Sequence, residues 1–331
     1  MIEGFPEFSS LSLEQRPELH PRFQRLPDGM SELTFAGLYL FREAHRYQVS
    51  HAGGDVFILA GADPEPFFIL PFELPQDDIL HSLLDRFETM KAVSPSQAGQ
   101  LRQKGCRVWE DRDNFDYLYP REKLATLSGR RLHRKKNLVN LFLRNNVCTA
   151  KPLLEEYAAD ALYILEQWRA QQEAANLVAA GGRRTEEERR PAASTALGPQ
   201  AGVSSLGTSA GCCNPEPRGV ADYVAAKEAL ENMEYLQLCG GIFYVDEEPV
   251  AYTLGEELAQ GRMYVIHFEK AVLRKQYAGI YQYVNRAFAA VLPEKYELIN
   301  REQDLGDPGL RQAKESYRPV GFVKKYRAAR L

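Results

Sequence analysis

The chain has 331 residues, of which 44% are hydrophobic, so it can bury either one large core or two ordinary ones, and two domains fit this length better. The formal net charge of −4 excludes a global attraction to nucleic acid or to anionic membranes, so any such binding must come from local basic patches. No apolar run approaches the ~20 residues of a membrane-spanning helix, and no secretory signal is recognisable, so we expect a cytoplasmic protein.

Residues 1–119 have the pattern of an α/β unit. Hydrophobic periodicity predicts, in order, two helices within 11–45, strands at 46–51, 55–61 and 66–72, helices at 76–90 and 94–105, and short strands at 106–110 and 116–120. The helix at 76–90 is amphipathic, with its apolar residues on one side.

Residues 120–331 show a similar order of elements. The patterns predict helices at 155–172 and 222–236, strands at 236–246, 249–257 and 261–270, a helix at 279–292, a strand from Tyr296, a helix from Pro308, and a strand at 320–326. The series of two helices, three strands, helix, strand, helix and strand therefore occurs twice, which predicts an internal duplication.

Residues 173–219 change abruptly to Ala, Gly, Ser, Arg and Glu. Such a segment has too little apolar surface to offset its ordering entropy, so we expect a disordered insert. It contains the adjacent Cys212 and Cys213, but the five cysteines of the chain lack CxxC spacing. We therefore expect neither a disulfide framework nor a metal site.

The stretch 296–326 concentrates polar residues where a strand ends. Asn300, Arg301, Glu302 and Asp304 lie where the strand ends, and Lys314, Tyr317 and Arg318 come one helix later. Loops after strands are where α/β folds usually bind ligands. These residues predict a binding or catalytic site, although a solvated ion-pair network fits the charge density equally well.

A family resemblance is carried by four segments. NREQDLG at 300–306 with GLRQAKESYRPVGF at 309–322, SELTFAGLYLF at 31–41, LSGRRLHRKKNLVNLF at 127–142 and the segment from residue 240 onward resemble bacterial proteins named for the phosphatidylglycerol lysyltransferase C-terminal domain. This resemblance implies an α/β fold of tandem GNAT-like domains with mixed sheets flanked by helices. It also implies transfer of an aminoacyl group from charged transfer RNA to a lipid such as phosphatidylglycerol.

For such a transfer, we expect Glu302 or Asp304 to remove the proton of the attacking group. Tyr317 would supply a proton to the leaving oxygen, because an ordinary tyrosine stays protonated at neutral pH. We expect Arg301, Lys314 and Arg318 to bind phosphate or carboxylate groups. Glu269 is a further candidate base, since it shares a strand face with His267 by the two-residue period, although a structural role is the commoner one for such residues.

Residues 276–281 correspond to the loop that binds the pyrophosphate of acetyl-CoA in GNAT enzymes. Gln276 and Gly279 match that pattern, but the bulky Tyr281 stands where a small residue is usual, so acetyl-CoA is disfavoured as the donor. A CoA-dependent N-acyltransferase nevertheless remains one alternative. A non-catalytic binding module is another, and replacing Asp304 by Asn would abolish activity only in an enzyme.

The densest basic run lies on a helix expected over 129–145. Arg131 and Lys135 share a face of this helix, and Arg130 and Arg134 share another, so the cations form a stripe able to meet phosphates of transfer RNA or of lipid headgroups. A peripheral position at the membrane surface would follow from this. The alternative is an ordinary solvated face, which is the commoner role of a charged run.

Overall fold

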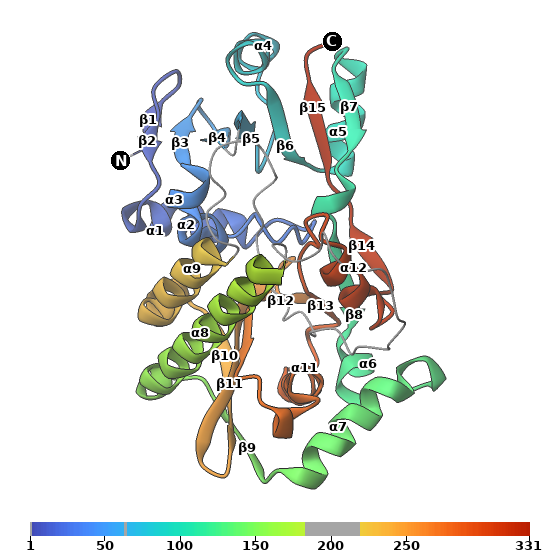
Figure 1. The fold of residues 1–331 in the computed structure, drawn as a ribbon. Helices are drawn as coiled ribbons and strands as arrows, with labels where there is room; N and C mark the ends of the chain where they lie inside the picture. The colour runs from blue at the N-terminus through green and yellow to red at the C-terminus, as the bar shows by residue number, and fades with distance from the viewer. Residues whose placement is uncertain (1, 63–64, 183–218) are drawn as a thin grey trace.

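The computed structural model describes residues 2–62, 65–182 and 219–331. Its secondary structure forms two mixed sheets flanked by helices (Figure 1). The predicted α/β fold class, with mixed sheets flanked by helices, is confirmed. No helix within these residues is both long enough and apolar enough to span a lipid bilayer.

The first sheet has the order β1-β3-β4-β5-β6-β15-β7, with β2 paired to β3. Its strands are β1 (Glu3–Gly4), β2 (Ser9–Ser10), β3 (Gln48–His51), β4 (Phe57–Ala62), β5 (Pro66–Ile69), β6 (Thr89–Val93), β7 (Arg107–Glu110) and β15 (Tyr326–Ala329). The helices of this part are α1 (Arg16–Phe23), α2 (Phe35–Leu40), α3 (Arg42–His45), α4 (Asp77–Arg86) and α5 (Pro95–Gln103).

The second sheet has the order β14-β8-β13-β12-β11-β10-β9. Its strands are β8 (Asp116–Pro120), β9 (Cys148–Pro152), β10 (Cys239–Val245), β11 (Glu248–Leu258), β12 (Met263–Ala271), β13 (Leu298–Asn300) and β14 (Gly321–Val323). The remaining helices are α6 (Arg121–Thr126), α7 (His133–Asn145), α8 (Ala158–Gly182), α9 (Val220–Glu231), α10 (Met233–Leu236), α11 (Ile280–Val291) and α12 (Pro308–Glu315).

A common arrangement appears in both sheets. In each, three antiparallel strands are followed by a crossover helix and a parallel strand: β3-β4-β5, α4 and β6 in the first sheet, and β10-β11-β12, α11 and β13 in the second. The crossover helix permits the parallel pairing, which a tight turn does not allow. This recurrence agrees with the duplication expected from the order of elements.

The sheets are not two consecutive domains, because strands cross between them. β8 falls mainly in the stretch predicted as the N-terminal unit but pairs in the second sheet, and β15 follows the second sheet but pairs between β6 and β7 of the first. One buried apolar cluster also contains residues of both sheets, such as Phe57 and Phe268. The boundary at 119/120 thus does not divide the sheets, which belong to one folded unit.

Three predicted boundaries differ in the structure. The helix expected to reach residue 90 ends at Arg86, where extended backbone at Phe87 leads into β6. The single strand expected at 320–326 divides into β14 and β15, which belong to different sheets. α8 extends to Gly182, so the first ten residues of the predicted insert are helical, and residues 183–218 of it lie outside the described part of the chain.

Candidate active site

Five consecutive polar residues lie at the end of β13 and directly after it, and all of them are buried. Each has at most 4% of its surface exposed, although none is apolar: Asn300, Arg301, Glu302, Gln303 and Asp304. Burying such groups costs free energy unless they are hydrogen-bonded, so their partners determine what this segment does.

Arg301 leads into a polar cluster between β12 and α11. Its Nη2 donates a hydrogen bond of 3.0 Å to Oε1 of Glu269, and both side chains are almost fully buried. Glu269 Oε2, Arg301 Nε and both amide atoms of Asn285 on α11 make no hydrogen bond of normal geometry within the described residues. Buried groups with unused hydrogen-bonding capacity are rare, and they indicate a position for a ligand or ordered water.

Burial shifts the pKa values of two groups in this cluster. Burial raises the pKa of Glu269, although the charge of Arg301 opposes the effect. Burial also raises the pKa of Tyr317 to about 12, so its hydroxyl is protonated at neutral pH. The Arg301 guanidinium lies 5.4 Å from the centre of the Tyr317 ring, so the predicted residues Glu269, Arg301 and Tyr317 are brought together.

Lys135 joins this cluster from α7 instead of remaining on the exposed basic face. Its Nζ lies 4.4 Å from the centre of the Tyr317 ring, and its side chain is half-buried. Burial, together with the charges of Arg301 and Arg134, lowers the pKa of Lys135 to about 8. The cluster therefore holds a second cation whose charge is easily removed.

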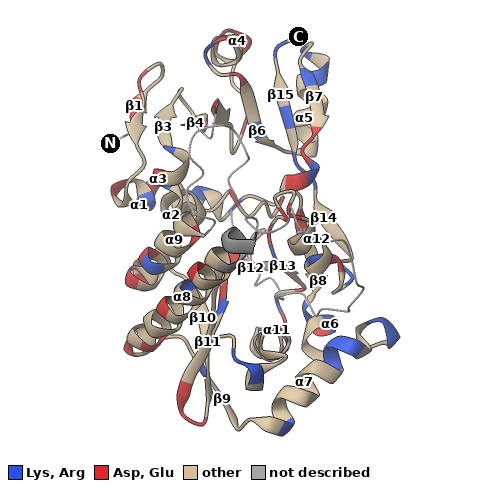
Figure 2. Cartoon of the chain, viewed as in Figure 1, with Lys and Arg blue, Asp and Glu red and all other residues tan. Residues whose placement is uncertain are grey.

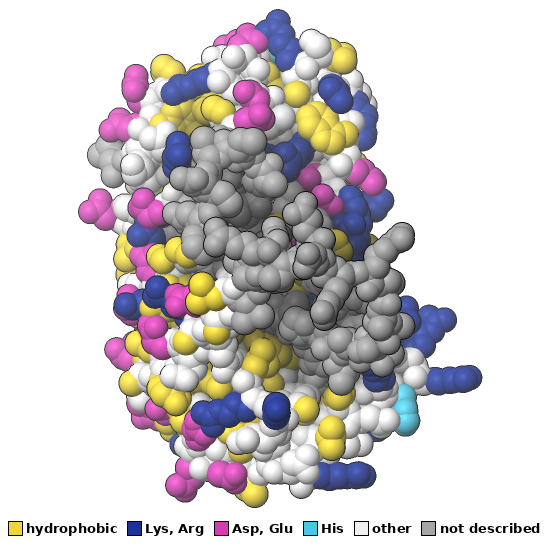
Figure 3. All heavy atoms as spheres, viewed as in Figure 1, with side chains coloured by type: hydrophobic (Ala, Val, Ile, Leu, Met, Phe, Trp, Pro, Cys, Tyr) yellow, Lys and Arg dark blue, Asp and Glu magenta, His cyan; other side chains and the backbone are white. Residues whose placement is uncertain are grey.

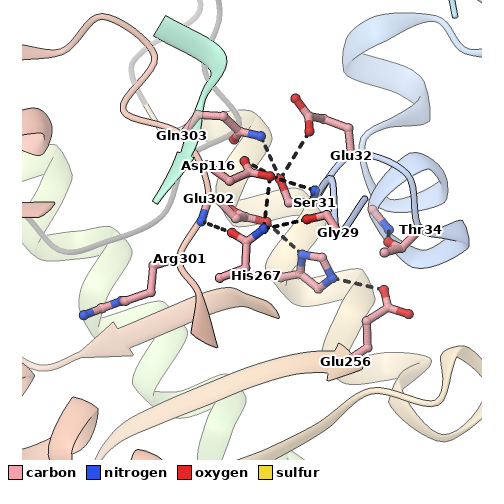
Figure 4. A network of polar contacts seen from close by, with 12 residues as sticks. Gly29, Ser31, Glu32, Thr34, Asp116, Glu256, His267, Arg301, Glu302 and Gln303 are labelled. Carbon is pink, nitrogen blue, oxygen red and sulfur yellow. Dashed lines mark hydrogen bonds and ion pairs between the residues drawn. The ribbon is translucent and has the colours of Figure 1, made fainter. Parts of the chain in front are cut away.

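Glu302 is held in a separate cluster by His267. His267 Nδ1 lies 2.8 Å from Glu302 Oε1, and its Nε2 lies 3.0 Å from Glu256 Oε1 (Figure 4). Burial lowers the pKa of His267, but the hydrogen bonds to Glu256 and Glu302 outweigh it and raise the pKa to about 10. Both ring nitrogens of this imidazolium thus donate to carboxylates.

The predicted shared face of His267 and Glu269 is wrong. The pairing of β11 with β12 shifts between Leu254 and Gly255, so His267 has no partner residue in the register. Such an irregularity interrupts the two-residue alternation of a strand. His267 and Glu269 consequently serve different clusters, and Figure 4 shows Arg301 pointing away from His267.

Asp304 is saturated with hydrogen bonds. Its oxygens accept from the guanidinium groups of Arg311 and Arg112, from the hydroxyl of Tyr117 at 2.6 Å and from the backbone of Gly306. Burial raises the pKa of Asp304, but the hydrogen bonds from Arg311 and Tyr117 outweigh this effect and hold the pKa below its usual range. Asp304 therefore anchors the loop after β13 to α12. Because its oxygens are already occupied and its pKa is lowered, Asp304 does not suit the role of base that the sequence predicted for it.

Lys314 is also inside the protein. Its Nζ donates to the backbone carbonyl of Arg301, and burial lowers its pKa to about 7 against the opposing charge of Glu302. The predicted phosphate contact of Lys314 would need an exposed ammonium group. Lys314 instead fixes the backbone that carries Arg301.

A second part of the network joins the site to the loop before α2. Asn300 Nδ2 donates to Gly29 O and Asp116 Oδ2, and Gln303 Nε2 donates to Ser31 Oγ, which in turn donates to Asp116 Oδ1 (Figure 4). Asn300 and Gln303 are therefore positioned by the loop before α2 and by β8.

Other predicted residues lie away from the cluster. Arg318 is exposed, as are Arg131 and Arg134, and Gln276 is exposed beside the start of α11. A Cβ atom on Gly279 would lie 2.4 Å from the carbonyl oxygen of Leu138, so this glycine permits contact between α11 and the backbone of α7. That contact occupies the approach expected for a pyrophosphate.

The exposed cations of α7 remain a surface feature. Figure 2 shows the ribbon at the start of α7 coloured blue for Lys and Arg, and Figure 3 shows Lys and Arg side chains projecting from the lower right of the molecule. The exposed residues there are Arg130, Arg131, Arg134 and Lys136. They adjoin the half-buried Lys135, so the basic face and the polar cluster share one helix.

Sequence reasoning missed Asn285 and the buried role of Lys325, which pairs with Glu32 and Asp116. A signal for Asn285 exists: it follows Gln282 by three residues on the same side of an otherwise apolar helix face. No comparable signal marks Lys325 among neighbouring basic residues.

Within the described parts of the chain, no group of three or more His, Cys, Asp or Glu side chains is arranged to hold a metal ion.

Solved structures resemble this chain over nearly its whole length. A conserved protein of unknown function from Bacteroides thetaiotaomicron has 26% identity and a TM-score of 0.75, with 100% of both chains covered. The C-terminal domain of a putative lysylphosphatidylglycerol synthetase from Agrobacterium fabrum has 15% identity and a TM-score of 0.56, with 97% of this chain and 93% of that chain covered. L-PGS from Bacillus licheniformis has 14% identity and a TM-score of 0.56, with 100% and 94% covered.

Sequence comparison identifies the family directly. Among curated proteins, none matches this sequence. The family model described as phosphatidylglycerol lysyltransferase, C-terminal, matches residues 23–198 and 216–329, which include the polar segment after β13, the strand that carries Glu269 and the basic helix α7. The chain therefore belongs to the phosphatidylglycerol lysyltransferase C-terminal family.

Proposed function

We propose that this protein transfers an aminoacyl group from charged transfer RNA to a hydroxyl group of a lipid such as phosphatidylglycerol. The observation that carries the proposal is the buried cluster of Glu269, Arg301 and Asn285, in which four polar atoms make no hydrogen bond of normal geometry within the described residues. The Tyr317 ring connects this cluster to the basic helix α7, because it lies close to both Arg301 and Lys135. Membership of the family supports the same class of reaction.

In this mechanism the acceptor oxygen attacks the ester carbonyl that links the amino acid to the transfer RNA. Glu269 is the base that takes the proton of the attacking hydroxyl, because its raised pKa increases its proton affinity and its Oε2 makes no hydrogen bond of normal geometry within the described residues. Arg301 and Lys135 stabilise the negative charge that develops on the carbonyl oxygen. Tyr317 supplies a proton to the ribose oxygen as the ester bond breaks.

The exposed cations of α7 would hold the transfer RNA. Arg131 and Arg134 present guanidinium groups to solvent on the same helix that carries Lys135, so a bound phosphate backbone would lie beside the cluster. Acetyl-CoA is the less favoured donor, since Gly279 packs against α7 where its pyrophosphate would approach.

The test is a transfer assay with purified protein, transfer RNA charged with labelled amino acids, and liposomes containing phosphatidylglycerol. We expect label to enter the lipid fraction, and Glu269→Gln to lower the rate by about a hundredfold or more, as loss of a general base does. Glu297→Gln is the control, because Glu297 is an exposed carboxylate just before β13.

Labelled acetyl-CoA with a mixture of polyamines and peptides is run alongside. Transfer from acetyl-CoA alone would replace the proposed donor. Absence of transfer from both donors by folded protein would contradict the proposal and favour a binding module.

A further inference from the structure

A cavity with an apolar floor and an acidic rim opens beside the first sheet. Its volume is about 470 Å³, and its walls come from the loop before α2, the loop after β5, the end of β6 and the start of α5. Cavities of roughly 300–1,000 Å³ are typical of small-molecule sites. None of its lining residues takes part in the transfer mechanism described above.

The cavity occupies a defined position in the repeated arrangement. The parallel pairing of β5 with β6 ends at Phe68 and Met90, and Ala92 then leaves the extended conformation, with a φ of 51°. The cavity lies beyond this point and is lined by Ala92 itself. In the second sheet, Glu269 likewise lies beyond the last parallel pair of β12 with β13. The two sheets therefore have candidate sites at corresponding positions.

The floor of the cavity is apolar. Met30, Leu33, Pro71 and Ala92 line it, and all four are buried. An aliphatic chain that covers these side chains would remove its own apolar surface and theirs from water, which is favourable.

Hydrogen bonds hold the walls of the cavity in place. Gln97 Nε2 donates to the backbone carbonyl oxygens of Leu70, at 2.8 Å, and Phe72, at 3.4 Å, so the loop after β5 is fixed to α5. Ser94 and Gln97 also bond to each other's backbone N–H groups at the start of α5. A site that is ordered in advance costs a ligand less conformational entropy than one that must form on binding.

The charge at the rim has one sign. Asp28 and Glu73 are the charged residues that line the cavity, and both are exposed. Neither carboxylate forms an ion pair within the residues that the structure describes, whereas Asp77 at the start of α4 pairs with Lys104. A cation in the cavity would therefore supply the counter-charge that both carboxylates lack.

The start of α5 does not turn the cavity into an anion site. The N–H groups in the first turn of a helix can bind an anion when they have no other partner. Here Pro95 has no N–H, and the N–H of Gln97 donates to Ser94 Oγ. The acidic rim thus determines the sign of the ligand.

We propose that this cavity binds a free aliphatic amine, with its hydrocarbon chain on the apolar floor and its ammonium group beside Asp28 and Glu73. An alcohol of the same length would leave the carboxylates without a counter-charge, and a carboxylate would be repelled by them. The site is independent of the transfer reaction and gives the first sheet a binding role of its own.

The test is a set of ligand-observed NMR titrations of the full chain at physiological salt concentration. The ligands are n-hexylamine, n-butylamine, 1-hexanol and hexanoate. We expect n-hexylamine to bind about tenfold more tightly than 1-hexanol, because hydrogen bonds to charged groups are stronger than those to neutral ones, and hexanoate to bind most weakly. n-Butylamine should bind more weakly than n-hexylamine by up to about fourfold for each methylene that it lacks.

Asp28→Asn and Glu73→Gln should each weaken the binding of n-hexylamine several-fold and leave that of 1-hexanol unchanged. Both residues are exposed, so these variants should fold as the wild type does. Ser96→Lys is a further variant, because Ser96 is exposed on the cavity wall and a lysine there would compete with the ligand for the carboxylates. Asp78→Asn is the matched control, since Asp78 is exposed on α4 and does not line the cavity.

Absence of binding by both amines, or binding of 1-hexanol as tight as that of n-hexylamine, would overturn the proposal. Equal weakening by Asp78→Asn would show a general attraction of amines to an acidic protein and overturn it as well. Binding that survives all three cavity variants would place the ligand elsewhere. Because the readout is binding alone, a failure of the transfer assay does not affect this result, and Glu269→Gln should bind n-hexylamine as the wild type does.

Discussion

At the scale of single residues, burial alone does not give a carboxylate its role. Glu269, Glu302 and Asp304 are all buried, yet their partners differ. Asp304 is saturated by guanidinium and hydroxyl donors, and Glu302 is bound to an imidazolium, whereas one oxygen of Glu269 makes no hydrogen bond of normal geometry within the part of the chain that the structure describes. Of these three, Glu269 therefore combines a raised pKa with room to accept a proton.

His267 gives a prediction with a defined dependence on pH. Its pKa in the folded protein is about 10, compared with about 6.5 in an unfolded chain, so its contribution to stability is fully present below pH ~6.5 and disappears as the pH rises toward 10. We expect His267→Gln to destabilise the protein most at pH 6, and the difference from wild type to shrink by up to about 1.4 kcal/mol per pH unit above that.

Urea unfolding at several pH values measures this difference. His133→Gln is the control, since His133 is exposed at the start of α7. A destabilisation that stays constant from pH 6 to pH 9 would show that His267 is neutral in the folded protein.

At the scale of elements, α7 presents cations to solvent on one side and packs against the protein on the other. Its exposed side carries Arg131 and Arg134, and its inner side packs on α11, where Leu138 contacts Gly279. A ligand held by the outer cations would thus be positioned by the same helix that supplies Lys135 to the buried cluster.

Neutralising the outer cations should weaken the binding of transfer RNA. We expect Arg131→Gln with Arg134→Gln to raise the KM for charged transfer RNA several-fold with little change in kcat. The slope of log affinity against log salt concentration should fall by about 0.7–0.9 for each phosphate that the variant no longer neutralises. Arg144→Gln, at the opposite end of α7, is the matched control. If Arg144→Gln weakened the binding of transfer RNA as much as the double variant does, the start of α7 would not be a specific RNA-binding element.

Gly279 tests the contact between α7 and α11. Its φ of 95° costs an L-residue about 1–2 kcal/mol, and a Cβ atom would in addition collide with Leu138 O. Gly129 has a similar φ of 94° with no atom within 4 Å of its hypothetical Cβ. Gly279→Ala should therefore lower the free energy of unfolding clearly more than Gly129→Ala, as measured by urea denaturation. Equal decreases would mean that α7 moves aside easily.

At the scale of the whole molecule, strand exchange joins the two sheets. β15 is hydrogen-bonded to both β6 and β7, so the first sheet is continuous only when this strand is present. Lys325, just before β15, is also buried against Asp116 of β8. The segment from β13 to β15, which contains residues 300–318 of the candidate site, thus begins in the second sheet and ends in the first.

Deleting residues 324–331 tests this dependence. We expect the full-length protein to unfold in one cooperative transition and the shortened protein to lose this cooperativity, because β7 would be left without its only strand partner among the described residues. Fluorescence of Trp109, which pairs with Arg327, reports the change in a Trp168→Phe background. Deleting only Arg330 and Leu331, which lie outside β15, should preserve the transition. Cooperative unfolding of the longer deletion would show that β15 is dispensable.

The sequence predicts those strands and helices whose apolar residues follow a regular local pattern, either alternation with polar residues or the helical period. The three-strand meander at 239–271, the helix α11 and the capped helix α12 follow from such patterns. Asp307 caps α12, since its side chain accepts a hydrogen bond from the backbone N–H of Leu310. β6 was missed because the apolar period of α4 continues into it. The exchange of β15 and the burial of Lys325 depend on partners hundreds of residues away, which no local pattern contains.

The sequence predicts the position of the candidate site but not the roles of its residues. The segment 300–304 was found because polar residues followed a strand, but the roles within it depend on neighbours contributed by other elements. Nothing in the order of Glu302 and Asp304 shows that His267 and Arg311 engage them. The bulge that separates His267 from Glu269 arises from pairing with β11, so the two-residue rule could not reveal it.

The place of β15 also bears on synthesis. Roughly two hundred residues separate β7 from the strand that completes its sheet, and a ribosome that adds about 5–20 residues per second needs about ten to forty seconds to make them. Throughout that time β6 and β7 present unpaired backbone groups to the surroundings. The nascent chain is therefore exposed to aggregation for longer than its size alone would require, and chaperone binding to the open edge would protect it.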